Sequence, residues 1–196
     1  MNKSEFFKLF YNPFERIAGA KALLAGIGFC AVIGLVGALS GAYFDGAIDC
    51  HLGAKGDFVR SFAFLAIDWA SLAAVFGAAA LIFAKNARLI DICGTMALAQ
   101  APRLFDALSA FFAPNLAVDE TLPLNELAGE LLQQIAQPAF IVFIIVSIVA
   151  TACHIALIYN AFRISTNLKV PKIIVIFIAG ILLAEVLSKV LIGVIF

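Results

Sequence analysis

Long apolar segments restrict the fold of this chain more than any other feature of its sequence. Four of them hold roughly 20 residues each, which at about 1.5 Å per residue is enough to cross a hydrocarbon core of about 30 Å. They cover approximately residues 21–44, 61–84, 139–159 and 173–196. The chain is 64% hydrophobic and 13% charged, whereas soluble domains are about half apolar and about a quarter charged. The sequence therefore predicts an all-α integral membrane protein, with a single membrane domain over residues 1–196.

A fifth apolar segment, residues 89–113, carries more polar groups than a lipid-facing helix tolerates. These residues are Asp91, Gln100, Pro102, Arg103 and Asp106. We expect an inner transmembrane helix whose polar side faces protein or water. Because Pro102 removes a backbone donor, a kink or break is expected near Gln100 to Arg103. The prediction is thus a bundle of five transmembrane helices.

Two amphipathic segments lie outside these five helices. Aromatic and basic residues mix near the N-terminus, which is typical of a segment in the membrane interface: Phe6, Phe7, Leu9, Phe10, Tyr11 and Phe14 with Lys3, Lys8 and Arg16. Between the third and fourth helices, apolar residues recur at steps of three or four: Leu124, Leu127, Leu131 and Ile135. This spacing predicts a short amphipathic helix at the membrane surface, with an ordinary structured loop as the alternative. The first apolar segment could also be a signal peptide, but its length favours an uncleaved helix.

The basic residues orient the bundle. Nine of them lie before helix one, between helices two and three, or between helices four and five: Lys3, Lys8, Arg16, Lys21, Lys85, Arg88, Arg163, Lys169 and Lys172. The opposite side carries only Lys55 and Arg60, together with most of the acidic loop residues. The positive-inside rule therefore predicts five crossings of a bacterial inner membrane, with a cytoplasmic N-terminus and a periplasmic C-terminus.

Five charged residues lie in the outer halves of the predicted helices: Asp68, Arg103, Asp106, Glu185 and Lys189. Charges at membrane depth are functional candidates by default. Arg103 and Asp106 can meet at i,i+3, and Glu185 and Lys189 at i,i+4, whereas Asp68 needs a partner from another helix. One hypothesis is a partly hydrated cavity lined by helices two, three and five. The alternative is a set of buried pairs that hold the helices together. His154, in helix four, is interpreted as a residue that hydrogen-bonds between helices.

The first outer loop contains a thiol among groups that ligate divalent metals, Asp45, Asp49, Cys50 and His51. A metal site at Asp45, Asp49 and His51 is one hypothesis, although acidic residues are expected in an outer loop in any case. No GxSxG, HExxH or P-loop sequence occurs. We therefore expect neither enzymatic activity nor a cofactor. The 13 basic and 13 acidic residues balance, so nucleic acid is not an expected partner.

Three stretches of the chain resemble bacterial members of the Yip1 domain family. They are Asn12-Pro13-Phe14-Glu15-Arg16-Ile17 before helix one, Gly94-Thr95-Met96-Ala97 through Ala101-Pro102-Arg103-Leu104-Phe105, and the tail that starts at Tyr159 and runs through Ala161-Phe162. The resemblance implies a five-helix membrane domain with a cytoplasmic N-terminus, and it brings no catalytic residues.

Two functions remain open at the level of sequence. The first is a non-enzymatic scaffold or partner-binding component of the envelope, in contact with the lipid bilayer and with other membrane proteins or further copies of itself. Small residues at four-residue spacing, Gly37 with Gly41 and Ala73 with Gly77, suggest such helix contacts. The alternative is a small-solute or ion transporter or channel that uses the intramembrane charges.

Overall fold

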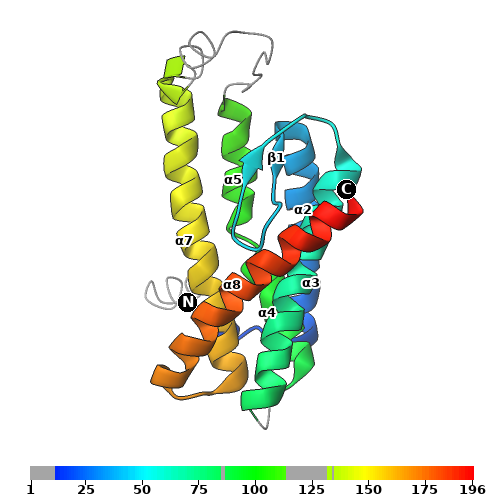
Figure 1. Ribbon diagram of the computed structural model, residues 1–196, viewed down its shortest axis with the longest axis vertical. Helices are drawn as coiled ribbons and strands as arrows, with labels where there is room; N and C mark the ends of the chain where they lie inside the picture. Colours follow the sequence, from blue (N-terminus) through cyan, green and yellow to red (C-terminus); the bar gives the residue numbers. More distant parts are fainter. Residues whose placement is uncertain (1–11, 85–86, 114–131, 134) are drawn as a thin grey trace.

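The computed structural model describes residues 12–84, 87–113, 132–133 and 135–196. Four helices are long and apolar enough to cross a membrane (Figure 1): α2 (Gly19–Ser40), α3 (Phe58–Phe83), α7 (Pro138–Thr166) and α8 (Val170–Ile195). Two shorter helices follow α3, namely α4 (Leu89–Ala99) and α5 (Arg103–Ser109), and there are 3-10 turns η1 (Pro13–Glu15) and η2 (Ala110–Phe112). The prediction of an all-α protein with several potential membrane spans is confirmed.

Two helix ends differ from the predicted ones by four residues or more. The first helix ends at Ser40 rather than near residue 44, because Gly41 adopts a left-handed conformation (φ 86°) that ends the helix. The helix predicted over 139–159 continues to Thr166, where Asn167 is left-handed in the same way. The N-terminal aromatic residues 6–11 and the predicted amphipathic helix around 124–131 lie outside the described residues. Phe14, the last aromatic residue of that N-terminal segment, is buried in the bundle core rather than in an interface.

The predicted break in the third segment is present. The backbone between α4 and α5 switches to i→i−3 hydrogen bonds, with Gln100 N donating to Ala97 O and Arg103 N to Gln100 O. Pro102 has no N–H to continue the α-helical pattern. This break leaves the carbonyl of Ala99 without the i+4 donor that a continuous helix would supply.

The α2–α4 contact depends on the absence of side chains at two glycines. A Cβ at Gly26 would lie 2.5 Å from the backbone of Ala97, and one at Gly94 would overlap the carbonyl of Gly19. The two backbones can approach this closely only because both positions are glycine. This close packing places the α4–α5 break inside the bundle.

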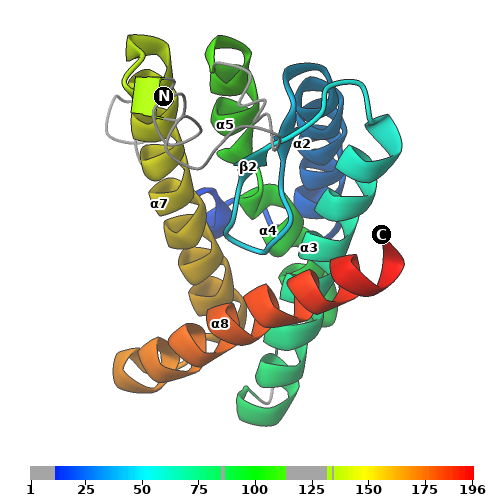
Figure 2. The ribbon, with the colours of Figure 1, turned by 45° about the horizontal axis from the view of Figure 1, so that its top comes forward.

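A hairpin connects α2 to α3 and does not stay at the surface. Its arms are β1 (Ala42–Tyr43) and β2 (His51–Leu52), which pair antiparallel with Tyr43 opposite His51. Figures 1 and 2 show the loop between them descending from the upper end of the bundle into the space bordered by α5, α7 and α8. Helices α7 and α8 meet at the turn near Asn167 and diverge from there, so that α8 crosses the molecule obliquely. We call residues 44–50 the loop tip.

Candidate functional site

The loop tip is irregular backbone inside a bundle of apolar helices. Its peptide groups pair with no neighbouring strand, so each needs a partner from elsewhere. Phe44 and Ala47 are buried in the core. Side chains far away in the sequence, on α5, α7 and α8, lie within hydrogen-bond distance of four of these peptide groups: the C=O groups of Gly46 and Ala47 and the N–H groups of Ala47 and Ile48. The N–H of Asp49 donates to Gly46 O within the loop itself.

Arg103, at the start of α5, supplies the first contact. Its Nη2 donates to the carbonyl of Gly46 at 2.7 Å, and its Nη1 pairs with Asp68 Oδ2 of α3 at 2.8 Å. The guanidinium carbon also lies 4.9 Å from the centre of the Phe44 ring. The side chains of Arg103 and Asp68 are 3% and 0% exposed. A guanidinium is always charged, and here it is neutralised by one carboxylate while it holds one loop carbonyl.

Helix α8 supplies acceptors for the next two peptide N–H groups. Ala47 N donates to Ser188 Oγ at 3.0 Å, and Ile48 N donates to Glu185 Oε2 at 2.9 Å. Lys189 lies 3.2 Å from the other Glu185 oxygen and 2.7 Å from Asp49 Oδ2. The tip is thereby attached to α8 by two backbone hydrogen bonds and an ion pair.

His154 of α7 connects the loop tip to the α4–α5 break. Its Nδ1 lies 2.7 Å from the carbonyl oxygen of Ala99, and its Nε2 lies 3.0 Å from that of Ala47. The Ala99 carbonyl is the one that the helix break leaves without a backbone donor. A neutral imidazole can donate to one of the two oxygens, whichever tautomer it takes. We call Asp68, Arg103, His154, Glu185 and Ser188 the loop-tip cluster.

The structure gathers four of the five predicted intramembrane charges around the loop tip. Asp68 has the partner from another helix that the sequence required, and Glu185 meets Lys189 as its i,i+4 spacing allowed. The fifth, Asp106, is buried on α5 near Ser147 of α7 and Cys50 of the loop tip, and its Oδ1 has no hydrogen-bond partner among the described residues. It does not pair with Arg103, because the guanidinium is directed toward Asp68 and the loop.

Sequence reasoning missed Ser188 and did not place the loop tip inside the bundle. One signal was available, since Phe44, Ala47 and Ile48 are unusually apolar for a solvated loop. The prediction that His154 hydrogen-bonds between helices is confirmed, because Ala99 belongs to α4; its other ring nitrogen lies beside Ala47 O of the loop tip.

The three residues of the predicted metal site do not meet at one point: Asp45 and His51 pair with each other, and Asp49 has other partners. His51 Nδ1 lies 3.0 Å from Asp45 Oδ1, and the His51 ring stacks on Tyr43. Asp49 instead accepts from Lys189 and from the backbone N–H of Cys50. The Lys189 ammonium is the main cause that lowers the pKa of Asp49 below the ordinary carboxyl value. Within the described part of the chain, no three His, Cys, Asp or Glu side chains are grouped so that they could hold a metal ion.

Some buried polar atoms near the cluster have no hydrogen-bond partner in the part of the chain that the structure describes. Gln100, at the helix break, is fully buried, and neither its Oε1 nor its Nε2 is hydrogen-bonded within the described residues. Asp68 Oδ1 and Ser71 Oγ on α3 are in the same condition. Such groups in folded proteins are usually satisfied by internal water. The interior around the break is therefore polar enough to hold water molecules.

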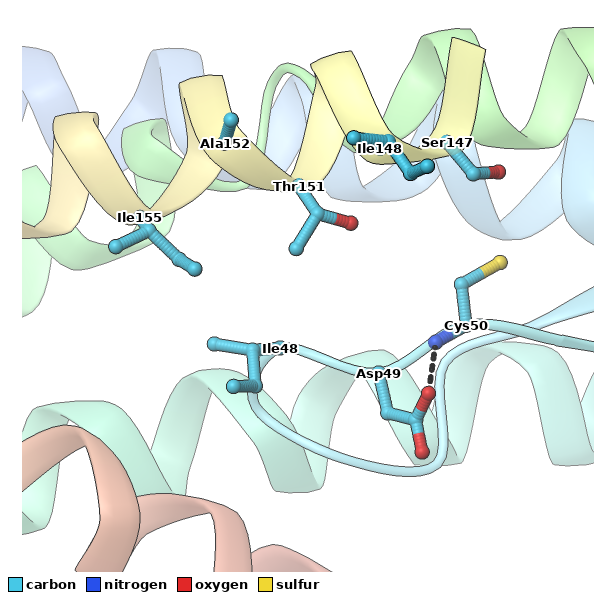
Figure 3. A pocket seen from close by; sticks show the side chains of 8 residues that line it. All are labelled: Ile48, Asp49, Cys50, Ser147, Ile148, Thr151, Ala152 and Ile155. Atoms are coloured by element: carbon cyan, nitrogen blue, oxygen red, sulfur yellow. Dashed lines mark hydrogen bonds between the residues drawn. The ribbon is translucent and has the colours of Figure 1, made fainter. Parts of the chain in front are cut away.

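A cavity of about 450 Å³ lies between the loop tip and α7 (Figure 3). The loop contributes Ile48, Asp49 and Cys50, and α7 contributes Ser147, Ile148, Thr151, Ala152 and Ile155. Figure 3 shows Thr151 and Ile155 of α7 on the side that faces Ile48 and Asp49. Neither Asp68, Arg103 nor Glu185 lines this cavity, so it differs from the one predicted between helices two, three and five.

No family model, curated protein or solved structure matches this chain. The resemblance to the Yip1 domain family therefore stays a prediction.

Proposed function

We propose that this protein is a non-enzymatic, multi-pass membrane scaffold that crosses the bilayer five times and acts through helix contacts. The observation that supports this function is the buried Asp68–Arg103 ion pair, whose guanidinium also donates a hydrogen bond to the Gly46 carbonyl. The intramembrane charges then serve to hold an inserted loop and to fix the arrangement of the helices around it.

The fifth crossing is formed by the broken segment. From Leu89 to the end of η2 at Phe112 the chain has 24 residues, and at about 1.5 Å per residue these extend about 36 Å, enough for a core of about 30 Å. Figure 1 shows α5 above α4 along the long axis of the molecule, so the two helices follow one another across it.

The alternative of transport makes a different demand on the same residues. A transported ion or solute must reach charged groups through water at some stage of its passage. The Arg103 guanidinium is bonded to Asp68 Oδ2 and to the loop, and both side chains are shielded from solvent, while Asp68 Oδ1 has no partner among the described residues. The contacts of the pair therefore account for both charges without a substrate.

The two functions separate when the pair is removed as a unit. Asp68→Asn leaves Arg103 buried without its counter-charge, and loss of one partner of a buried pair costs about 3–5 kcal/mol. The double variant Asp68→Leu with Arg103→Met removes both charges, and such replacements are often close to neutral. We expect the single variant to lower the thermal unfolding temperature in detergent strongly. The double variant should recover part of this loss, because no buried charge is left unpaired although the Gly46 carbonyl loses the Arg103 donor.

The exposed pair Asp57–Arg60 provides the matched control. It joins the same residue types at 3.6 Å, with side chains that are 43% and 49% exposed. Arg60→Gln should change stability by less than about 1 kcal/mol.

Purified wild-type protein in sealed vesicles should pass protons and sodium ions no faster than empty vesicles do. A flux that the wild type carries, and that the well-folded double variant lacks, would overturn the scaffold function in favour of transport.

A further inference from the structure

The cavity between α7 and the loop tip continues onto the lipid-facing surface of the protein. Ile148 lines the cavity and is nevertheless 64% exposed. The neighbouring apolar side chains Ile145 and Val149 on α7 are also exposed. In a membrane these exposed side chains contact lipid chains, and the cavity wall is an extension of the same surface.

The cavity also lies at the level of the hydrocarbon core. Its α7 residues run from Ser147 to Ile155, in the middle of a helix that extends from Pro138 to Thr166. Ser147 is nine residues after the start of α7, which at about 1.5 Å per residue places it about 14 Å along the helix. Lipid headgroups are therefore not expected at this depth, whereas acyl chains are.

The one charged side chain that lines the cavity, Asp49, is already bonded to other groups. Its carboxylate is bonded to Lys189 and to the Cys50 N–H. The apolar members of the lining are Ile48, Ile148, Ala152 and Ile155, and Ser147, Thr151 and Cys50 add two hydroxyls and a thiol. The cavity therefore favours an apolar occupant over an ion.

The cavity volume of about 450 Å³ leaves room for a segment of one acyl chain. Water alone is a poor occupant, because cavities lined by aliphatic side chains stay dry and take up apolar molecules instead.

We propose that one acyl chain of a membrane lipid leaves the surrounding bilayer and lies in this cavity, where it contacts Ile48 and Cys50 of the loop tip. The binding site requires only the cavity and its opening toward lipid, so it is independent of the scaffold function.

The test uses the full chain in vesicles of phosphatidylcholine that contains a photoactivatable group midway along one acyl chain. After illumination, mass spectrometry of peptides measures the label on the segment around residues 48–50. We expect this segment to be labelled to an extent similar to the exposed face of α2, and at least several-fold more than the buried segment 92–99 of α4. If the loop segment is labelled no more than the buried segment 92–99 of α4, the proposal is overturned.

A pair of variants on α7 tests whether the label arrives through the cavity. Thr151→Phe fills the cavity and should lower labelling of the loop several-fold. Val149→Phe, on the exposed side of α7 outside the lining, should leave it unchanged. If Thr151→Phe folds and the loop is still labelled as in the wild type, the cavity is not the lipid's path. If Thr151→Phe does not fold, the wild-type measurement alone decides.

Discussion

At the residue scale, the main feature is that side chains replace the missing strand or helix partners of the loop tip. Each buried peptide group without a partner would cost about 1–3 kcal/mol. Arg103 meets the carbonyl of Gly46, and Ser188 and Glu185 meet the next two N–H groups. Polar side chains are unfavourable inside a membrane, and so are peptide groups without hydrogen bonds. Here the polar side chains supply the hydrogen bonds that the irregular backbone of the loop tip lacks.

Gly46 gives the sharpest prediction at this scale. A Cβ there would overlap the Glu185 carboxylate, whose Oε2 accepts from Ile48 N. We expect Gly46→Ala to displace Glu185, to break that hydrogen bond and to destabilise the protein by about 1–3 kcal/mol. Thermal unfolding in detergent and hydrogen exchange of the Ile48 amide measure the two effects.

Gly28 supplies the control for this substitution. It lies on the exposed face of α2, and a Cβ there would meet nothing within 4 Å. Gly28→Ala should be neutral or stabilising by up to about 1 kcal/mol, because alanine favours a helix over glycine. Equal unfolding temperatures for the two variants would show that the loop tip does not depend on the space at Gly46.

At the scale of elements, the break between α4 and α5 and the hairpin depend on each other. The break frees the Ala99 carbonyl, and His154 lies against that oxygen and against Ala47 O of the loop. It also places Arg103 at the start of α5, where its side chain reaches both α3 and the loop. A continuous helix would leave no free carbonyl at Ala99 for His154.

The position of the break depends in turn on the close contact of α2 with α4. Gly94→Ala would place a Cβ against the backbone carbonyl of Gly19, which cannot move aside as a side-chain end can. We expect the helices to separate and the free energy of unfolding to fall by about 1–3 kcal/mol, which thermal unfolding in detergent measures. On α8, Gly193→Ala meets open space and should be neutral or slightly stabilising.

At the scale of the whole molecule, the charges at the helix ends predict an orientation. Arg163, Lys169 and Lys172 lie around the turn from α7 to α8, so this turn should face the cytoplasm. Green fluorescent protein fused after Asn167 should fluoresce, and alkaline phosphatase fused after Phe196 should be active outside. Fluorescence from a C-terminal fusion at Phe196 would contradict five crossings with a cytoplasmic N-terminus.

The sequence by itself determined the features that depend on local composition. Apolar segments of sufficient length predict helices that can span a membrane, and Pro102 with its polar neighbours predicts the break, because both effects act within a few residues. The pairing of Glu185 with Lys189 was predictable for the same reason. The partner of Asp68 could be expected only as a charge from another helix.

Only the tertiary structure decided that the tip of the loop between α2 and α3 enters the bundle. Its stability inside the bundle depends on side chains such as Glu185 and Ser188, which are about 140 residues away in the sequence. The sequence pattern of α8 does not indicate whether these side chains will hydrogen-bond to the backbone of a distant loop, because that depends on how α7 and α8 diverge in space. The intramembrane charges were visible in the sequence, but what they bond to is a property of the folded chain.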